Sequence, residues 1–209
     1  MKNYTIKKCG GTPDWSMIPV TWIDCFCWKD QYPYQPRSMA QLCLIDDAKI
    51  AVRLCSYEEN PVSVCCQTDG FVYKDSCIEF FVNPYPEDSD CYINFECNHN
   101  GWLFINYGTE TDWHYRHKIT ELGLRHPQVT TFRGIGSLGD YWGVSFEIPL
   151  SFFETVYGKK ELRHGHKLRG SFFKCGDGTA HPHFGSWQPI QSERPNFHLP
   201  EFFGDLFIE

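Results

Sequence analysis

The sequence lacks long runs of residues of one chemical kind, and each absence removes a class of protein. No run of Lys or Arg is longer than two residues, and the formal net charge is −7. Nothing is therefore present to neutralise a phosphate backbone, and we expect no nucleic acid partner. No apolar stretch approaches the ~20 residues that cross a bilayer, so we expect no membrane partner either.

Targeting and linker signals are also missing. The first ten residues (1–10) are not followed by the apolar segment of a secretory signal, which predicts a cytoplasmic protein. A secreted protein whose signal had been removed would show the same pattern. We see no internal repeat, low-complexity tract or linker, and 209 residues suit one domain over residues 1–209.

The eleven cysteines do not form a recognisable framework. Their number is odd and their spacing irregular, which is unlike a disulfide scaffold. The close pairs Cys25/Cys27 and Cys65/Cys66 lack the two-residue gap of a zinc knuckle. We therefore predict reduced thiols, and Cys43, Cys55, Cys77 and Cys97 are expected to lie buried in strands as small apolar side chains.

Long helical periodicity is scarce, whereas short runs rich in Val, Ile, Phe and Tyr recur between turn signals. This pattern predicts an all-β fold, an antiparallel, jelly-roll-like β-sandwich with at most one or two short helices. A hairpin turn is expected at residues 46–48, a tight turn at Asn100-Gly101 and a helix over 151–157. The expected strands cover residues 38–45, 49–57, 76–83, 91–97, 102–107, 129–134, 141–149, 167–175 and 202–208.

Polar residues alternate with apolar ones in three of these strands. Period-two alternation sends the apolar residues inward and the polar ones to the opposite face. We expect the polar set to share one sheet face. Its members are Glu79, Asn94, Glu96, Ser145 and Glu147.

Aromatic residues are abundant, with 17 Phe, 11 Tyr and 7 Trp, so some rings should lie on the surface. Rings stack on the apolar face of a sugar, and carboxylates and amides bind its hydroxyls. The face is therefore suited to sugars, although an ordinary solvated sheet face would have the same alternation.

Several blocks resemble the family 9 carbohydrate-binding modules. Residues 73–81 read as the aromatic-x-Asp-Ser-x-x-Glu-x-Phe strand start of that family, and residues 92–96 and 144–149 are similar to later strands. The blocks 169–187 and 197–204 resemble the end of bacterial family 9-like proteins that stand alone. The order of these blocks, over roughly residues 20–209, is more specific than any one of them.

The resemblance implies a β-sandwich that binds a mono- or oligosaccharide without catalysis. It implies that a terminal sugar is held between two rings, Tyr73 and Trp187, and that Glu79 accepts a hydrogen bond from it. Asn94 and Glu96 lie near the family's next polar pair but depart from its Arg and Asn. Tyr73 stands where well-known members carry Trp, and Ser171 where Asn is expected, so the recognised hydroxyls can differ.

Other groups are assigned by simpler arguments. Lys174 lies near the proposed site and could donate to a hydroxyl, whereas Asp75 is expected to serve the turn before its strand. The partner is then a carbohydrate, and we expect no cofactor. Family 9 modules can carry structural calcium, for which the acidic loop residues Glu87, Asp88 and Asp90 offer oxygen ligands.

Two other functions stay open. A glycoside-processing hydrolase could use outward carboxylates such as Glu79 and Glu96 as acid and base. A metal or haem site could use His164/His166 or His181/His183, since each pair would lie on one side of an extended strand. The only methionines, Met1, Met17 and Met39, lie outside the core strand motifs.

Overall fold

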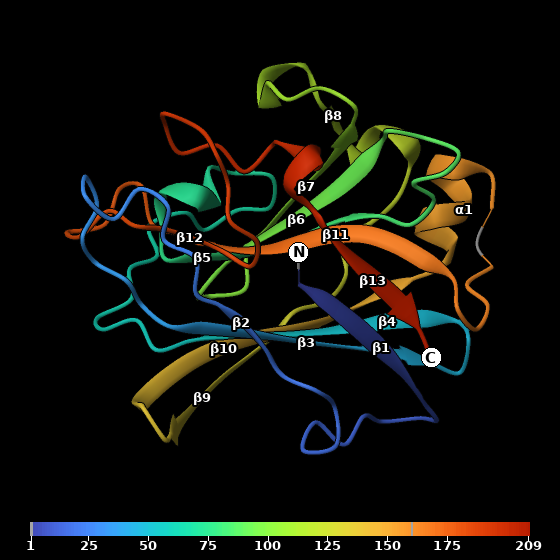
Figure 1. Cartoon of the computed structure of the whole chain (residues 1–209), viewed down its shortest axis with the longest axis horizontal. Coiled ribbons are helices and arrows are strands. Elements are labelled where there is room, and N and C mark those ends of the chain that lie inside the picture. The colour runs from blue at the N-terminus through green and yellow to red at the C-terminus, as the bar shows by residue number, and fades with distance from the viewer. Residues whose placement is uncertain (1, 160) are drawn as a thin grey trace.

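The computed structural model describes residues 2–159 and 161–209, and these form two layers of strands with one α-helix at an edge (Figure 1). Four single-turn 3₁₀ helices punctuate the loops: η1 (Val72–Lys74), η2 (Trp113–Tyr115), η3 (Ile119–Leu122) and η4 (Pro200–Phe202). The strands and the helix are β1 (Asn3–Cys9), β2 (Thr21–Ile23), β3 (Ser38–Ile45), β4 (Lys49–Ser56), β5 (Cys77–Asn83), β6 (Tyr92–Asn98), β7 (Leu103–Gly108), β8 (His117–Lys118), β9 (Thr130–Gly136), β10 (Gly139–Pro149), α1 (Ser151–Tyr157), β11 (Lys167–Cys175), β12 (Phe184–Ser186) and β13 (Gly204–Ile208).

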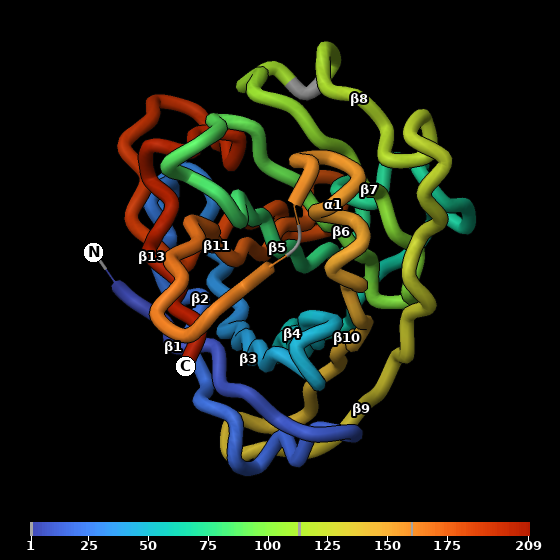
Figure 2. Tube along the Cα trace, turned by 90° about the vertical axis from the view of Figure 1, so that its right-hand side faces the viewer, coloured from blue at the N-terminus to red at the C-terminus, as the bar shows by residue number. Residues whose placement is uncertain are grey.

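The strands form one continuous hydrogen-bonded path that folds back on itself. Its order is β8-β7-β6-β5-β11-β13-β1-β3-β4-β10-β9, with β12 added beside β11 and β2 beside β3. We call the layer from β8 to β13 the upper sheet and the layer from β3 to β9 the lower sheet, as they lie in Figure 1; Figure 2 shows them from the side. The predicted β-sandwich is confirmed.

Strand β1 joins the two sheets. Its first half, Asn3 to Ile6, pairs with β13 of the upper sheet, and its second half, Lys7 to Cys9, pairs with β3 of the lower sheet. Both pairings are parallel, whereas the other strand pairs among the described residues are antiparallel. The antiparallel sandwich that we predicted is confirmed, and these two parallel pairings add a seam that was not expected because β1 was not predicted as a strand.

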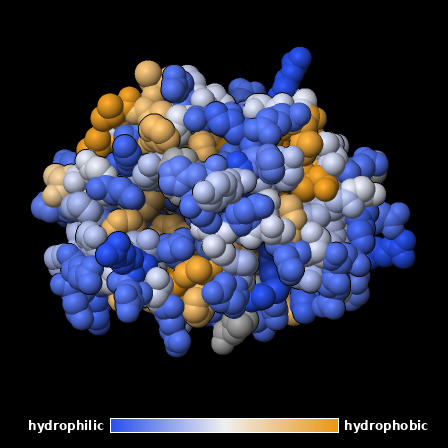
Figure 3. All heavy atoms as spheres, turned by 90° about the horizontal axis from the view of Figure 1, so that it is seen from above, coloured by the Kyte–Doolittle hydropathy of each residue, from blue (hydrophilic) through white to orange (hydrophobic). Residues whose placement is uncertain are grey.

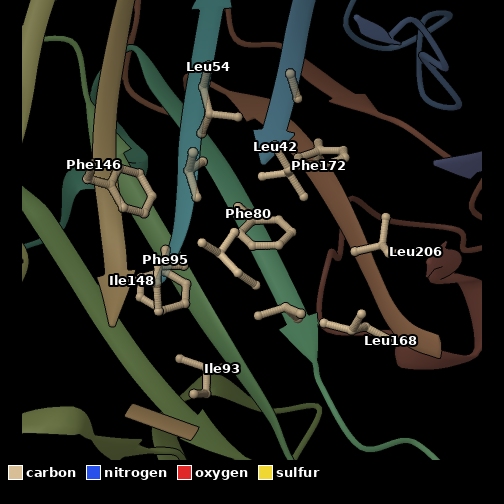
Figure 4. Close-up of a cluster of buried hydrophobic side chains, with 14 of the residues drawn as sticks. Leu42, Leu54, Phe80, Ile93, Phe95, Phe146, Ile148, Leu168, Phe172 and Leu206 are labelled. Carbon is tan, nitrogen blue, oxygen red and sulfur yellow. The ribbon is translucent and has the colours of Figure 1, made fainter. Parts of the chain in front are cut away.

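The core fills the space between the sheets, with side chains from both layers (Figure 4). Phe80 of β5 stacks on Phe172 of β11 within the upper sheet, with ring centroids 5.1 Å apart. Phe95 of β6 meets Phe146 of the lower sheet at 5.8 Å. The predicted alternation of β5, β6 and β10 is thus confirmed for the apolar residues expected to point inward, which all belong to this core.

Local signals in the sequence located most elements. Helix α1, strand β3 and strand β11 have the predicted bounds. The hairpin turn is present, and Asp46 and Asp47 adopt the left-handed conformation there with φ of 49° and 50°. Gly101 has φ of 88°, as its tight turn requires. The short strands β2, β8 and β12 were not predicted, because two or three residues carry no detectable period.

The cysteines are free thiols in the part of the chain that the structure describes. Cys43, Cys55, Cys77 and Cys97 lie buried in strands, as predicted. Among residues 2–159 and 161–209, no helix has the length and apolar character needed to cross a membrane.

Candidate functional site

A cavity of about 200 Å³ opens on the outer face of the upper sheet. Figure 3 looks down on this side of the molecule, where apolar atoms are visible in recesses between hydrophilic ones. The cavity lies over β5, β6 and β11 and is bordered by η1 and by the segment that precedes η4. It is lined by Tyr73, Glu79, Glu96, Phe104, Cys175, Asp177, Phe184, Pro195, Asn196, Phe197 and His198.

Two carboxyl groups lie side by side among the lining residues. Glu79 of β5 and Glu96 of β6 are directly opposed across the antiparallel pair, so their side chains project from the same face. Only 2% and 5% of their surfaces are exposed. Burial, and then the neighbouring Glu96, raise the pKa of Glu79 well above its usual value. Burial likewise raises the pKa of Glu96 to about 7.

Each carboxyl group is held by a neighbouring side chain. The thiol of Cys175 on β11 donates to Glu79 Oε1 at 3.0 Å. The Asn94 amide donates to Glu96 Oε1 at 2.9 Å. Because Cys175 lies on the strand next to β5 and Asn94 lies two residues before Glu96 on β6, the rotamers of the two glutamates are fixed before any ligand arrives.

Arg116, just before β8, orders the polar row beside the cavity. Its guanidinium donates to Asn94 Oδ1 from Nε at 3.1 Å and from Nη2 at 2.9 Å. It also donates to the Tyr92 carbonyl oxygen at 2.8 Å and lies over the Tyr92 ring at 3.8 Å from its centroid. The amide of Asn94 is therefore fully engaged between Arg116 and Glu96, so Asn94 orients Glu96 from behind and does not line the cavity.

Tyr73 and Asp177 approach each other at one side of the cavity. Tyr73 belongs to η1 and is half-buried, and its carbonyl oxygen accepts the backbone N–H of Asp177 at 3.2 Å. Burial, and then the charge of Asp177, raise the pKa of Tyr73. Asp177 is exposed, which leaves a carboxylate at the rim and a neutral phenol beside it.

The aromatic lining comes mainly from β12 and from the segment before η4. Phe197 stacks on Phe173 of β11 at 4.4 Å with an interplanar angle of 11°, and it meets Phe184 edge to face at 6.3 Å. His198 follows, and its Nδ1 shares a hydrogen bond of 2.9 Å with the Tyr92 hydroxyl. Burial, and then Arg116, lower the pKa of His198 to about 3, so its ring is neutral.

Trp187 does not lie in this cavity. Its side chain is 0% exposed and packs in the core between the sheets, edge to face with Phe172 at 5.5 Å. The expectation that Trp187 forms a sugar-stacking wall is therefore wrong. Its backbone N–H donates to the Phe172 carbonyl oxygen at 2.8 Å, just after β12, and this connection directs the indole inward.

Lys174 also faces the core side of the upper sheet and is 0% exposed. Its Nζ donates to the Cys175 carbonyl oxygen and to His183 Nε2, each at 2.7 Å, and it forms an ion pair with Glu58 Oε2 at 3.0 Å. Burial alone would raise the pKa of Glu58, but Lys174 and His183 hold it below its usual value. Lys174 is thus part of a buried ionic network and cannot reach a sugar in the cavity.

The remaining polar predictions divide between the two sheets. Ser145 and Glu147 lie on the outer face of the lower sheet, where Glu147 pairs with Lys49 at 2.5 Å. The expected shared face with Glu79 is wrong for these two, because alternation gives the face of a strand but not its sheet. Asp75 does not line the cavity, but its carboxylate does not serve the turn before its own strand either: it accepts the backbone N–H groups of Val64 and Cys65, each at 3.0 Å, in an earlier loop.

One group of side chains at the cavity has the composition of a metal site. The ligand atoms of Cys77, Glu79 and Cys175 lie within 4.8 Å of one another, and two thiolates with a carboxylate suit Zn²⁺. Burial, however, raises the pKa of the Cys77 thiol to about 12 and that of Cys175 well above its usual value. In the structure, the neutral thiol of Cys175 donates a hydrogen bond to Glu79.

Four of the other candidate metal ligands have protein partners. Asp88 pairs with Lys159 at 2.6 Å, and Glu87 with Lys167 at 3.1 Å, so two of the three acidic residues proposed for calcium are already neutralised. His183 is engaged by Lys174, as described above. His166 shares a hydrogen bond of 2.7 Å with the Pro84 carbonyl oxygen.

The structure thus brings together Tyr73, Glu79 and Glu96 of the predicted site, with Asn94 behind them. Lining residues supplied by β7, by the end of β11 and the loop after it, by β12 and by the segment before η4 were not predicted from the sequence. One of them could have been found from strand alternation: Cys175 follows Lys174 along β11, so the two side chains point to opposite faces of the sheet. The missed lining residues are Phe104, Cys175, Asp177, Phe184, Pro195, Asn196, Phe197 and His198.

Comparison with known proteins places this geometry in a family. The sequence model described as carbohydrate-binding family 9 matches residues 13–208. Among solved structures, a candidate carbohydrate-binding protein from Bacteroides uniformis ATCC 8492 is 32% identical, with a TM-score of 0.81 over 100% of this chain and 99% of the other. A comparison with curated protein sequences gave no match.

Two further similar structures are of a family 9 module from Caldicellulosiruptor kristjanssonii. One is in complex with cellotriose (14% identity, TM-score 0.67, 100% of this chain and 94% of the other), and one with glucose (14%, 0.66, 100% and 96%). At that identity they support the shared fold alone. The family match over nearly the whole chain, together with the Bacteroides relative, shows that this chain belongs to carbohydrate-binding family 9.

Proposed function

We propose that this protein binds one sugar residue in the cavity on the upper sheet, without catalysing a reaction. The observation that carries the proposal is the combination of two buried carboxyl groups, Glu79 and Glu96, with aromatic rings around one cavity. Carboxyl groups exchange hydrogen bonds with hydroxyls, and rings contact the apolar face of a pyranose.

The size of the cavity supports a single ring as the ligand. Its volume of about 200 Å³ is below the ~300–1,000 Å³ typical of sites for drug-sized molecules. One sugar unit would then be enclosed, and the rest of an oligosaccharide would extend past the exposed rim at Asp177. The named complexes of the Caldicellulosiruptor modules with glucose and cellotriose agree with ligands of both lengths.

Tyr73 is the stacking ring whose removal tests this proposal most directly. Glycan-array screening followed by calorimetry should identify a ligand, and Tyr73→Ala should weaken its binding about ten-fold, since stacking contributes ~0.5–1.5 kcal/mol beyond burial. Tyr141→Ala is the matched control, because Tyr141 is also half-buried but lies on β10 of the lower sheet. Equal affinity of the Tyr73 variant and the parent would contradict the proposed site.

Binding without catalysis is supported by the family to which the chain belongs, which is described as carbohydrate-binding, and the carboxyl groups are suited to that role. Glu79 and Glu96 are fixed by Cys175 and Asn94, and both have raised pKa values, which favours neutral groups that exchange hydrogen bonds with hydroxyls. A panel of aryl glycosides should therefore give no release of the aryl group above buffer. Hydrolysis that disappears in Glu79→Gln would instead establish a hydrolase.

A further inference from the structure

The charge of the cavity, rather than its shape, indicates which sugars it prefers. Three of its lining residues are acidic: Glu79, Glu96 and Asp177. No Lys or Arg is among its described lining residues, and the one histidine there, His198, is kept neutral by burial and by Arg116. The groups of the lining that can carry a charge near neutral pH are therefore all acidic.

The two buried glutamates make this charge costly without a cationic partner. They are directly opposed across β5 and β6, so ionising both places two negative charges side by side with little solvent. The nearest cations are directed elsewhere: Arg116 donates to carbonyl oxygens, and Lys174 pairs with Glu58 on the core side of β11. A positive group between the glutamates would relieve the repulsion and form charge-assisted hydrogen bonds.

Resting on the proposed function, we infer that the preferred ligand is an amino sugar, a hexosamine with a free ammonium group that lies between Glu79 and Glu96. The hydroxyls and the apolar face of its ring contact the remaining polar and aromatic lining, as in the binding of a neutral sugar. The ammonium donates to both carboxylates, and the nearby ring of Tyr73 adds to the attraction of a cation. An acidic sugar cannot form these charge-assisted bonds, and it meets the carboxylate of Asp177 at the rim.

Proton release distinguishes this arrangement from simple hydrogen bonding. In the free protein the glutamates hold protons near neutral pH, because burial and their mutual proximity oppose ionisation. An ammonium group favours their ionised forms, so its binding expels protons to the solvent. A neutral sugar leaves the protons in place. The other titratable and charged groups near the pair are Tyr73, Lys74, Cys77, Tyr92, Arg116, Lys174, Cys175, Asp177 and His198.

Calorimetry with matched sugar pairs tests the inference. The probes are glucosamine against glucose, galactosamine against galactose and mannosamine against mannose, at pH 6.5 where the amines are protonated. At least one amine should bind about ten-fold or more tightly than its neutral partner, as one charge-assisted hydrogen bond warrants. N-acetylation of the preferred amine should remove the gain, and glucuronic acid should bind more weakly than glucose.

Repeating the titration at pH 6.5 in phosphate and in ACES, which both buffer at that pH, measures the proton release. These buffers differ in ionisation enthalpy, so the apparent binding enthalpy of the amine should differ between them, whereas that of the neutral sugar should not. Glu96→Gln should bring the ratio of amine affinity to neutral-sugar affinity to within about two-fold, because Gln cannot ionise although its oxygen still accepts from Asn94. Glu147→Gln, on the lower sheet, is the matched control and should keep the full preference.

The outcomes separate the inference from the function on which it rests. Binding of neutral hexoses with no preference for any amine would overturn the inference and leave the proposed function intact. A preference for the amine that survives Glu96→Gln would also overturn it, because the ammonium would then lie elsewhere. Failure of every sugar in the three pairs to bind, confirmed on a glycan array, would overturn both.

Discussion

Replacing Lys174 with Met should destabilise this protein strongly while leaving its sugar affinity unchanged. The Lys174 ammonium is fully buried and bonds to Glu58, His183 and the Cys175 carbonyl oxygen. Methionine fills a similar volume but removes the charge. The Glu58 carboxylate, which also accepts hydrogen bonds from Ser76 at 2.7 Å and from Trp142 at 3.3 Å, would remain buried without its cation.

The expected loss follows from the cost of an uncompensated buried charge. Breaking a buried ion pair by removing one partner typically costs ~3–5 kcal/mol, and 1 kcal/mol shifts Tm by ~2–4 °C in a domain of this size. Tm should therefore fall by ~6–20 °C. The double variant Lys174→Met/Glu58→Gln removes both charges and should recover part of this loss, because Gln can still accept from Ser76.

Urea unfolding of the parent, both single variants and the double variant gives the coupling energy of the pair. Lys8→Met is the matched control, since Lys8 pairs with Asp47 at 2.7 Å but both side chains are exposed, and it should cost no more than ~1 kcal/mol. A loss below ~1 kcal/mol for Lys174→Met, or a double variant as unstable as the sum of the singles, would refute the reasoning. Loss of sugar binding by folded Lys174→Met would show that Lys174 takes part in the binding site.

Three further predictions concern the cavity and the core. Glu96→Gln should stabilise the protein more at pH 8 than at pH 5: the folded-state pKa is raised to about 7, so the carboxyl holds its proton in the fold at pH 5, and its ionisation at higher pH costs stability. A parent–variant difference independent of pH in chemical denaturation would contradict this. Trp187→Ala should cost ~3–5 kcal/mol in urea unfolding and leave the sugar affinity of the folded protein unchanged, because the indole lies in the core; loss of affinity without loss of stability would show the reverse. Prolonged EDTA treatment should leave sugar affinity in calorimetry unchanged, since the cavity thiols are protonated and two loop carboxylates have lysine partners; a loss that Zn²⁺ or Ca²⁺ restores would reveal a metal requirement.

The local features of this fold could be predicted from the sequence because they arise from short-range chemistry. Alternation correctly assigned both faces of β5 and β6, which placed Glu79 and Glu96 away from the core. It could not show that β10 belongs to the other sheet, because the period of a strand contains no information on its partners. Glu147 was misplaced for that reason alone.

The site was predicted only in part, and the errors have two distinct causes. Lys174 shares its parity with Leu168 and Phe172, which face the core, so alternation along β11 would have placed it inward. Trp187 offered no such signal, because its direction depends on the three-residue strand β12 and its pairing with β11. The segment 195–198 has no periodic pattern, and only tertiary folding brings it over the cavity.

The parallel pairing of β1 with β13 has a mechanical consequence. Asn3 faces Asp205 and Ile6 faces Ile208, and the two strands run side by side in the same direction (Figure 1). A pulling force applied across the two ends of the chain therefore acts along these strands in opposite senses. The force therefore loads the hydrogen bonds between β1 and β13 together, in shear, rather than breaking them one after another. The hydrogen bonds between β3 and the second half of β1 share this load. A module tethered at one end and drawn on at the other would thus resist tension at the seam that joins its two sheets.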